Sequence, residues 1–173
     1  ARVLSCLLES FEKAEIWCGL HARDVPMKHP ALRSLKLNLE DETDLSEIPT
    51  PLDLVVHFAG LTHSLDEERY RSVNTRGTLR LAESARERGC RRFVYISTRC
   101  ATRGSGAYGE SKREAELALQ KLDWEQLLII RPSEVYGGEG SEGVDKFIRL
   151  ARRYHVVPLL CGDRGLQFAP LHV

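Results

Sequence analysis

Strand-type and helix-type hydrophobic patterns alternate along the whole chain, and this alternation constrains the fold more than any other feature. The clearest strand is the continuous apolar run over residues 53–60 (DLVVHFAG), a pattern typical of a strand buried on both faces of a parallel sheet. His57, inside this run, is interpreted as a hydrogen-bonded core histidine. The longest helical pattern spans residues 65–89, with Gly89 as its stop signal. Further strands are predicted over residues 15–20, 35–39, 92–98, 126–130 and 155–160, and further helices over residues 2–12, 107–122 and 143–153. The sequence therefore predicts an α/β fold: a doubly wound parallel sheet with helices on both faces.

The composition excludes several classes of protein. The 173 residues fit one ordinary domain, and 25 basic residues balance 25 acidic ones, so no net field attracts nucleic acid or an anionic membrane. The five cysteines are odd in number and form no C-x-x-C pair, which argues against a disulfide framework or a zinc site and for a reducing cytosol. Neither a signal-peptide pattern nor an apolar run of about 18 residues is found. We therefore expect a cytoplasmic protein without a metal site, and with neither nucleic-acid nor membrane partners.

A tyrosine and a lysine lie one helical turn apart at the start of the predicted helix 107–122. Tyr108 and Lys112 share a helical face, and Thr98 ends the preceding strand, at the edge where doubly wound folds bind ligands. A free phenol has a pKa of about 10, and a nearby ammonium would lower the pKa of Tyr108 toward the range a proton shuttle needs. Thr98 could hold a substrate oxygen against the same phenol. The spacing alone is weak evidence, since a chance Y-x-x-x-K arises in roughly one such chain in six; Lys112 would then be a solvated helix residue.

The residues around this pair resemble the extended short-chain dehydrogenase/reductase family, which includes NAD(P)-dependent nucleotide-sugar epimerases and dehydratases. The resemblance rests on FVYIST, YGESK and LLIIRPSEVYG, together with the segment RYRSVNTRGTLRLAESARERGCRRFVYIS. It implies a single Rossmann-type NAD(P)-binding domain over residues 1–173. It also implies that Tyr108 is the proton shuttle, that Lys112 holds the cofactor ribose, and that Thr98 positions the reacting oxygen. Asn74, at the place of the family's long-helix asparagine, would shape the site through a bound water or a backbone contact; an asparagine facing solvent is the alternative.

The same resemblance implies a set of cofactor-binding residues. The run DLVVHFAG would lie under the nicotinamide ribose, and no aspartate ends the strand predicted over residues 15–20 to receive a ribose 2′-hydroxyl. Arg23 lies where a 2′-phosphate would bind, which favours NADP over NAD, and an ion pair with Asp24 is the alternative. Asn38 replaces the family's usual aspartate near the adenine, and Arg131-Pro132 either contacts the cofactor or simply ends a strand. The candidate cofactor-binding residues are Arg23, Asn38, Phe58, Ala59, Gly60, Lys112, Arg131 and Pro132.

The sequence also departs from the family pattern. The family's first strand and glycine-rich phosphate loop are absent, and Ala1 resembles the residue just after the last glycine. We therefore expect a piece of a longer protein, truncated at both ends, which binds a dinucleotide weakly or not at all and is inactive by itself. Two strand edges would stay unpaired, because the absent strand is a central one. The run 138–143 (GEGSEG) reads as G-x-G-x-x-G, but it does not directly follow a strand and its glutamates would repel a pyrophosphate, so we interpret it as a flap.

Two functions of different classes are consistent with these residues. The first is an NAD(P)-dependent oxidoreductase, epimerase or dehydratase that acts by hydride transfer on a nucleotide sugar or a similar hydroxyl or carbonyl substrate; a simple carbonyl reductase also remains open. The second is a catalytically silent NAD(P)-binding regulatory or assembly subunit. The intact set of Thr98, Tyr108 and Lys112 favours the enzyme. The loop 100–104 (CATRG), which replaces the Tyr-Gly often found there in the family, mildly favours the silent subunit. The resemblance also suggests a homodimer through residues 65–89 and 107–122, with a solvated charged face as the alternative.

Overall fold

The computed structural model describes residues 2–22, 24–25, 27–40, 45–133, 135–136, 144–155 and 171–172. The chain divides into two compact units, Ala1–Ile130 and Arg131–Val173. The first unit contains, in chain order, α1 (Arg2–Ser10), β1 (Ile16–Leu20), β2 (Leu32–Lys36), β3 (Leu54–His57), α2 (Glu67–Tyr70), η1 (Arg71–Gly77), α3 (Thr78–Glu87), β4 (Arg92–Ile96), α4 (Gly106–Leu119) and β5 (Gln126–Ile130).

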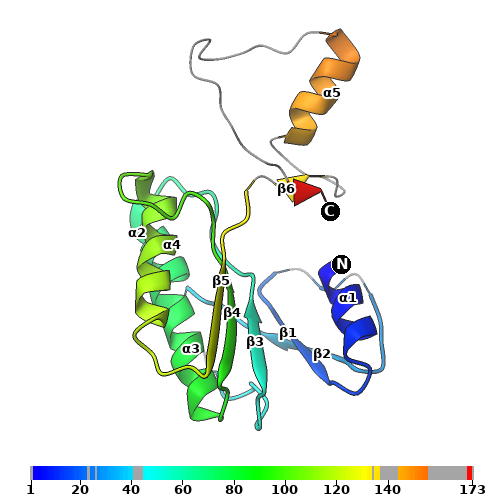
Figure 1. The fold of residues 1–173 in the computed structure, drawn as a ribbon, viewed down its shortest axis with the longest axis vertical. Coiled ribbons are helices and arrows are strands. Elements are labelled where there is room, and N and C mark those ends of the chain that lie inside the picture. The colour runs from blue at the N-terminus through cyan, green and yellow to red at the C-terminus, as the bar shows by residue number, and fades with distance from the viewer. Residues whose placement is uncertain are drawn as a thin grey trace. The chain divides into compact units, whose positions relative to one another are not determined.

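The strands of the first unit form two parallel sheets. One sheet pairs β1 with β2, and the other has the order β3-β4-β5, in which Val55 lies opposite Phe93 and Phe93 opposite Leu127. Within the described part of the chain, β1 pairs only with β2, and β3 only with β4, so one edge of each has no partner strand, as predicted. Helices α2–α4 lie on one side of the strands and α1 on the other (Figure 1), which confirms the α/β class.

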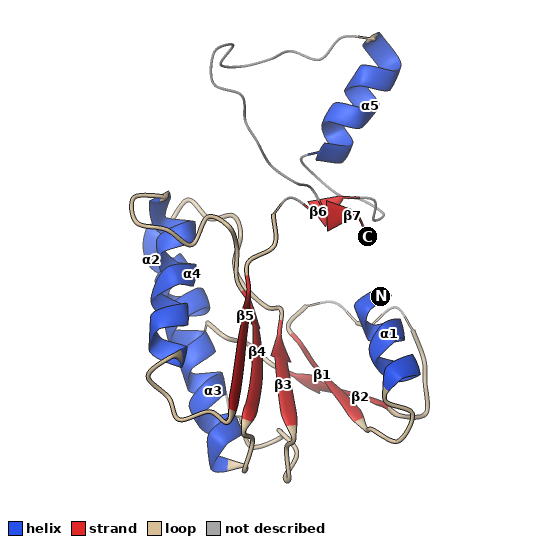
Figure 2. Ribbon diagram, viewed as in Figure 1, coloured by secondary structure: helices blue, strands red, loops and turns tan. Residues whose placement is uncertain are grey.

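The core lies between the β3-β4-β5 sheet and the helices that cover it (Figure 2). Phe93 and Tyr95 on β4 are fully buried against Ala82 on α3 and against Ala115 and Leu119 on α4. Alternate residues of a strand point to opposite faces, so these two aromatic rings fill one face and fix how both helices dock. The docked helices in turn place the start of α4 beside the carboxyl end of β4.

The predicted long helix is present, but its middle turn is wider than an α-helix. It begins with Asp66, whose side chain accepts a hydrogen bond from the Glu68 amide at 3.0 Å, and it ends before Gly89, which has a φ of 84°. Between α2 and α3, η1 is a π-helix, a form that is frequent at functional sites. Gly77, its last residue, lies so close to Leu39 that an added Cβ would be 2.9 Å from the Leu39 Cβ.

The second strand is displaced from its predicted position. The alternation of Leu35, Leu37 and Leu39 indicated a strand over residues 35–39, whereas β2 spans Leu32–Lys36. Leu37 still donates one backbone hydrogen bond to Leu20 at 2.8 Å, and Leu39 then packs against Leu81 in a second apolar cluster. The alternating leucine pattern therefore continues past the strand because these side chains pack in a cluster outside the sheet. Alternation alone does not distinguish such residues from residues on the face of a strand.

The second unit contains β6 (Val135–Tyr136), α5 (Val144–Tyr154) and β7 (Leu171–His172). β6 and β7 pair in parallel, with Val135 opposite Leu171. Helix α5 matches the prediction over 143–153. Of the strand predicted over 155–160, only His155 is described, and its φ of 56° is not that of a strand. The run 138–143 lies outside the described residues.

Candidate functional site

The candidate residues gather at the carboxyl ends of β3 and β4, the edge where ligands bind in doubly wound folds. Phe58, Ala59 and Gly60 follow β3 directly, and all three are exposed. Thr98 lies two residues beyond the end of β4, and Tyr108 lies in the first turn of α4. The sequence thus placed these residues at the correct edge of the sheet.

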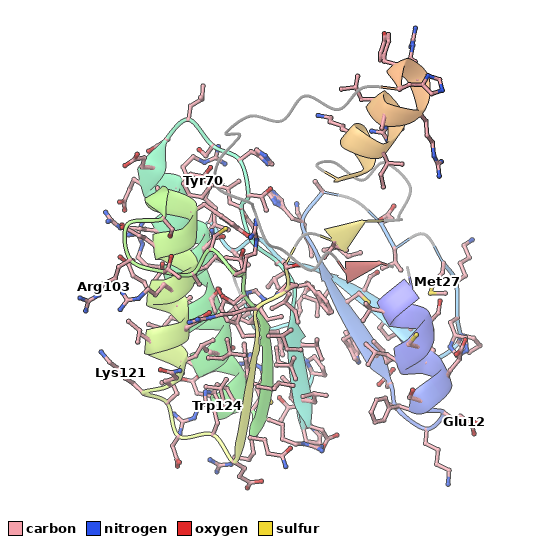
Figure 3. The ribbon with its side chains drawn as sticks, turned by 45° about the horizontal axis from the view of Figure 1, so that its top comes forward. Glu12, Met27, Tyr70, Arg103, Lys121 and Trp124 are labelled. Carbon is pink, nitrogen blue, oxygen red and sulfur yellow. The ribbon has the colours of Figure 1, made fainter. Side chains whose placement is uncertain are left out.

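Tyr108 and Thr98 interact through their side chains. The pKa of Tyr108 is raised above its usual range by burial, and a side-chain hydrogen bond with Thr98 partly offsets this rise. The ring of Tyr108 also packs edge-on against that of Tyr70, with 6.1 Å between centroids. Tyr70, seen near the end of α2 in Figure 3, accepts a hydrogen bond from the Ser64 amide at 2.8 Å, so it ties the loop after β3 to the phenol.

Lys112 is buried, with 3% of its surface exposed, so it is not the solvated helix residue of the alternative interpretation. Its ammonium donates a hydrogen bond to the Ile96 carbonyl at 2.8 Å and lies 4.2 Å from the centroid of the Tyr95 ring. Burial lowers the pKa of Lys112 to about 8, and the negative charge of Glu116 acts in the opposite direction.

One expectation about this pair is not met. We expected the Lys112 ammonium to lower the pKa of Tyr108, but that pKa is raised, chiefly by burial. The physical reason is burial of the phenol, while the Lys112 ammonium is bound at the end of β4 by the Ile96 carbonyl and the Tyr95 ring. The phenol of Tyr108 therefore keeps its proton at neutral pH.

Asn74 is buried in η1, with 1% of its surface exposed, so the solvent-facing alternative is wrong. Its side-chain oxygen accepts a hydrogen bond from the Leu61 amide at 2.7 Å, and its side-chain nitrogen donates to the Leu61 carbonyl at 3.0 Å and to the Ser111 hydroxyl at 3.1 Å. The backbone contact suggested by the sequence is thus present. One amide side chain joins the loop after β3 to η1 and α4.

Gly60 lies directly against these two buried side chains. A Cβ added at Gly60 would be 3.1 Å from the Asn74 side-chain oxygen and 3.6 Å from the Lys112 ammonium nitrogen. A side chain there would crowd the floor of the site, whereas glycine leaves the backbone accessible. Gly60 is therefore suited to the close approach of a ligand.

The other four candidate cofactor-binding residues are Asn38, Arg23, Arg131 and Pro132. Asn38, two residues beyond β2, accepts a hydrogen bond from the Glu40 amide at 3.0 Å and so forms a local turn. Arg23 lies outside the described residues. Arg131 and Pro132 belong to the second unit, and β5 ends just before them at Ile130, as their strand-ending interpretation predicted.

His57 is a core histidine, as predicted. It is buried on β3, shares a 2.9 Å hydrogen bond with the Thr78 hydroxyl and stacks on the Tyr95 ring with 5.7 Å between centroids. Burial, together with the Lys112 charge, lowers the pKa of His57 to about 3, so the ring is neutral at ordinary pH. A neutral ring fixed in this way supports the packing of β3 against β4.

Three buried residues of this region were missed by the sequence analysis: Tyr70, Ser111 and Glu116. Ser111 donates a hydrogen bond to the Tyr108 carbonyl at 2.7 Å, and its own carbonyl accepts one from the Thr75 hydroxyl at 2.9 Å. Glu116 accepts a short hydrogen bond from the Ser97 hydroxyl. A signal was available, because Glu116 follows Lys112 by four residues and falls on the same helical face.

In the described ranges, no three histidine, cysteine or acidic side chains are grouped so that they could hold a metal ion. None of the helices in the described part of the chain is long and apolar enough to cross a membrane.

Comparison with known proteins places these features in a family. Residues 7–166 match the model of the NAD dependent epimerase/dehydratase family. The chain is 33% identical over 151 residues to a ceramide reductase of Caulobacter vibrioides, an alignment that covers 84% of this chain and 46% of the relative. It is 36% identical over 126 residues to UDP-glucose 4-epimerase of Vibrio cholerae, covering 58% of this chain and 38% of the relative. The chain therefore spans less than half the length of these two relatives.

Solved structures show the same fold. The Bordetella bronchiseptica enzyme WbmG in complex with NAD aligns with a TM-score of 0.67 at 21% identity, over 86% of this chain and 56% of that one. MoeE5 in complex with UDP-glucose and NAD aligns with a TM-score of 0.70 at 22% identity, over 87% and 56%. At these identities the likeness shows the fold alone. Because the family model spans nearly the whole chain and agrees with the resemblance found in the sequence, this protein belongs to the NAD dependent epimerase/dehydratase family.

Proposed function

We propose that this chain forms the catalytic part of an NAD(P)-dependent epimerase, dehydratase or reductase in which Tyr108 is the proton shuttle. The observation that carries the proposal is the arrangement of three groups beside the carboxyl end of β4. The Tyr108 side chain is hydrogen-bonded to that of Thr98, and the buried ammonium of Lys112 lies one turn farther along α4. A phenol, a hydroxyl and a buried cation suit the interconversion of a secondary alcohol and a carbonyl.

The residues present fit the nicotinamide end of the cofactor that the family uses. Gly60 leaves its backbone open to a ligand, and Lys112 carries three N–H groups, of which the Ile96 carbonyl takes one. The ammonium would hold ribose hydroxyls, and Phe58 and Ala59 would contact the cofactor from the loop after β3. NAD(P), when bound, supplies or accepts a hydride at its nicotinamide ring.

The protein's own part in the reaction is proton transfer and orientation. Thr98 would hold the reacting oxygen against the Tyr108 hydroxyl. Loss of a hydride from carbon and of a proton from oxygen turns a carbinol into a carbonyl, and the reverse delivery restores the alcohol. Because burial raises the pKa of Tyr108, its phenol is protonated at neutral pH and is ready to donate to a carbonyl oxygen.

We propose a nucleotide sugar as the substrate class. Support comes from the UDP-glucose 4-epimerase relative and from the UDP-glucose bound in the structure of MoeE5. A reductase acting on another carbonyl compound is the alternative, because the ceramide reductase aligns over a larger share of this chain. We also propose a homodimer through η1, α3 and α4. Because α4 packs against η1 and α3, the outer faces of these helices form one surface that a second copy could contact.

The test of the catalytic proposal is Tyr108→Phe, made in the same reading frame extended at both ends. We expect NADH affinity to change less than threefold, while turnover of a UDP-sugar or carbonyl substrate falls by roughly 10²-fold or more, since only the transferable proton is removed. NADH fluorescence measures binding, and absorbance at the nicotinamide band measures turnover. Tyr154→Phe, an exposed tyrosine on α5, is the matched control. Equal turnover in Tyr108→Phe and wild type would overturn Tyr108 as the proton shuttle, whereas no turnover in either protein, with NADH binding intact, would favour the silent NAD(P)-binding subunit.

A second prediction concerns the cofactor preference, and the same fluorescence titration, made with both NADH and NADPH, tests it. If Arg23 receives a 2′-phosphate, NADPH will bind about tenfold more tightly than NADH, and Arg23→Ala will reduce NADPH affinity while leaving NADH affinity unchanged. If the arginine instead pairs with Asp24, Arg23→Ala will affect both cofactors equally. Tighter binding of NADH by the wild type would reverse the proposed preference for NADP.

A further inference from the structure

Helix α4 buries two oppositely charged side chains on successive turns. Lys112 has 3% of its surface exposed and Glu116 has 2%. Charged groups are seldom buried this fully unless they are paired and hydrogen-bonded, because removing them from water costs several kcal/mol. The proposed reaction uses Lys112 but gives Glu116 no part, so the buried carboxylate calls for an explanation.

The two side chains bind consecutive residues at the end of β4. The Lys112 ammonium donates to the Ile96 carbonyl at 2.8 Å, and the Ser97 hydroxyl donates to the Glu116 carboxylate. Thr98, the candidate catalytic hydroxyl, is the next residue along the chain. Helix α4 therefore contacts the strand end through two adjacent polar interactions. These contacts position Thr98 beside Tyr108, which lies about two helical turns before Glu116.

The carboxylate is also the main negative charge near the ammonium. Burial lowers the pKa of Lys112 to about 8, and Glu116 raises it. The other titratable groups around Lys112 are His57 on β3, Tyr95 on β4 and Tyr108 on α4; burial lowers the pKa of His57 to about 3 and raises those of both tyrosines. Because their pKa values are shifted in these directions, all three side chains are neutral between pH 6 and pH 9. Asn74 and the loop 58–61 carry no charge.

We propose that Glu116 is a positioning residue of this site, which keeps Lys112 protonated and fixes the end of β4 that carries Thr98. The proposal rests on the function proposed above, in which the protonated ammonium holds the cofactor ribose. It assigns Glu116 an electrostatic role: the carboxylate sets the highest pH at which the site can bind its cofactor.

The test measures Lys112 directly and needs no cofactor. In protein labelled with ¹³C at the lysine ε-carbon, the Lys112 resonance, assigned by its loss in Lys112→Met, reports the pKa of that ammonium. In Glu116→Gln this pKa should fall by roughly one unit or more, because the negative charge that raises it is removed. Glu116→Asp, whose shorter side chain withdraws the carboxylate, should give a smaller fall and carries the test if the glutamine variant does not fold. Glu114→Gln, which removes a partly exposed carboxylate from the same helix, should leave the Lys112 titration unchanged.

Cofactor affinity then tests the link to function. In the extended protein, NADH affinity should decline above about pH 8 in the wild type and above about pH 7 in Glu116→Gln. A Lys112 resonance that titrates at the same pH in wild type and Glu116→Gln would overturn the role of Glu116, whatever the protein binds. A Lys112 shift as expected, in a wild-type protein that binds neither NADH nor NADPH, would overturn the proposed function and leave the electrostatic pairing standing.

Discussion

Replacement of Gly77 with alanine is expected to lower the free energy of unfolding by roughly 2 kcal/mol or more, although the residue lies in a helix. In an exposed helix the same change stabilises by about 1 kcal/mol, because alanine has the higher helix propensity. At Gly77 the new Cβ would lie 2.9 Å from the Leu39 Cβ and still closer to the Leu39 carbonyl oxygen. That carbonyl is held by the Arg80 guanidinium at 2.8 Å, so the backbone has little freedom to withdraw.

Urea unfolding followed by circular dichroism measures the effect, with Gly19→Ala as the matched control. The Cβ of that variant would be 2.8 Å from the Leu37 Cδ2, the far end of a side chain that can rotate away, so we expect a smaller loss. Gly77→Val should be more harmful than Gly77→Ala. If Gly77→Ala raises the unfolding midpoint, as propensity alone requires, then η1 does not approach Leu39 as closely as the structure has it.

The fold was predictable from sequence wherever the sequence pattern reflects the local structure of a single helix or strand. The strand over residues 126–130 and the stop at Gly89 were predicted at their observed positions, because a pre-proline residue and a left-handed glycine mark ends locally. The second strand was predicted three residues too late, since Leu37 and Leu39 are buried by packing outside the sheet. The π-helical turn has no periodic signal of its own, as it depends on contacts of Asn74 and Gly77 with other elements.

The candidate site divides in the same way. Tyr108 and Lys112 were found because their spacing lies within one helix and Thr98 because it ends a strand. Glu116 and Ser111 were missed, because their partners, Ser97 and Asn74, lie 19 and 37 residues away in sequence. The pKa of Tyr108 was predicted in the wrong direction: spacing places an ammonium nearby, but only the structure shows that the Ile96 carbonyl and the Tyr95 ring hold it.

The second large effect is expected at Asn74, the side chain that joins three parts of the site. Asn74→Ala removes one acceptor and two donors, and it leaves the partly buried Leu61 backbone without its Asn74 partners, which should cost roughly 2–4 kcal/mol of unfolding free energy. Asn74→Asp keeps the shape and the bond from the Leu61 amide, but it sets a carboxylate against the Leu61 carbonyl in a fully buried position. We therefore expect the aspartate variant to be at least as unstable as the alanine variant above pH 6, and to recover part of its stability as the pH falls and the carboxyl is protonated.

Ser72→Ala is the matched control for Asn74, since its hydroxyl lies in the same π-helical turn and makes one 3.3 Å bond to the Glu40 carbonyl. We expect it to cost at most about 1 kcal/mol. Urea unfolding at pH 5 and pH 8 compares the three variants, and NADH affinity in the extended protein shows whether the loop 58–61 keeps its place. Because Leu61 is anchored to η1 by Asn74, cofactor affinity should fall at least tenfold in Asn74→Ala under conditions where the protein is still folded, and stay within twofold in Ser72→Ala. Wild-type affinity in folded Asn74→Ala would mean that the loop after β3 is held by Tyr70 alone, and that the asparagine serves stability without shaping the site.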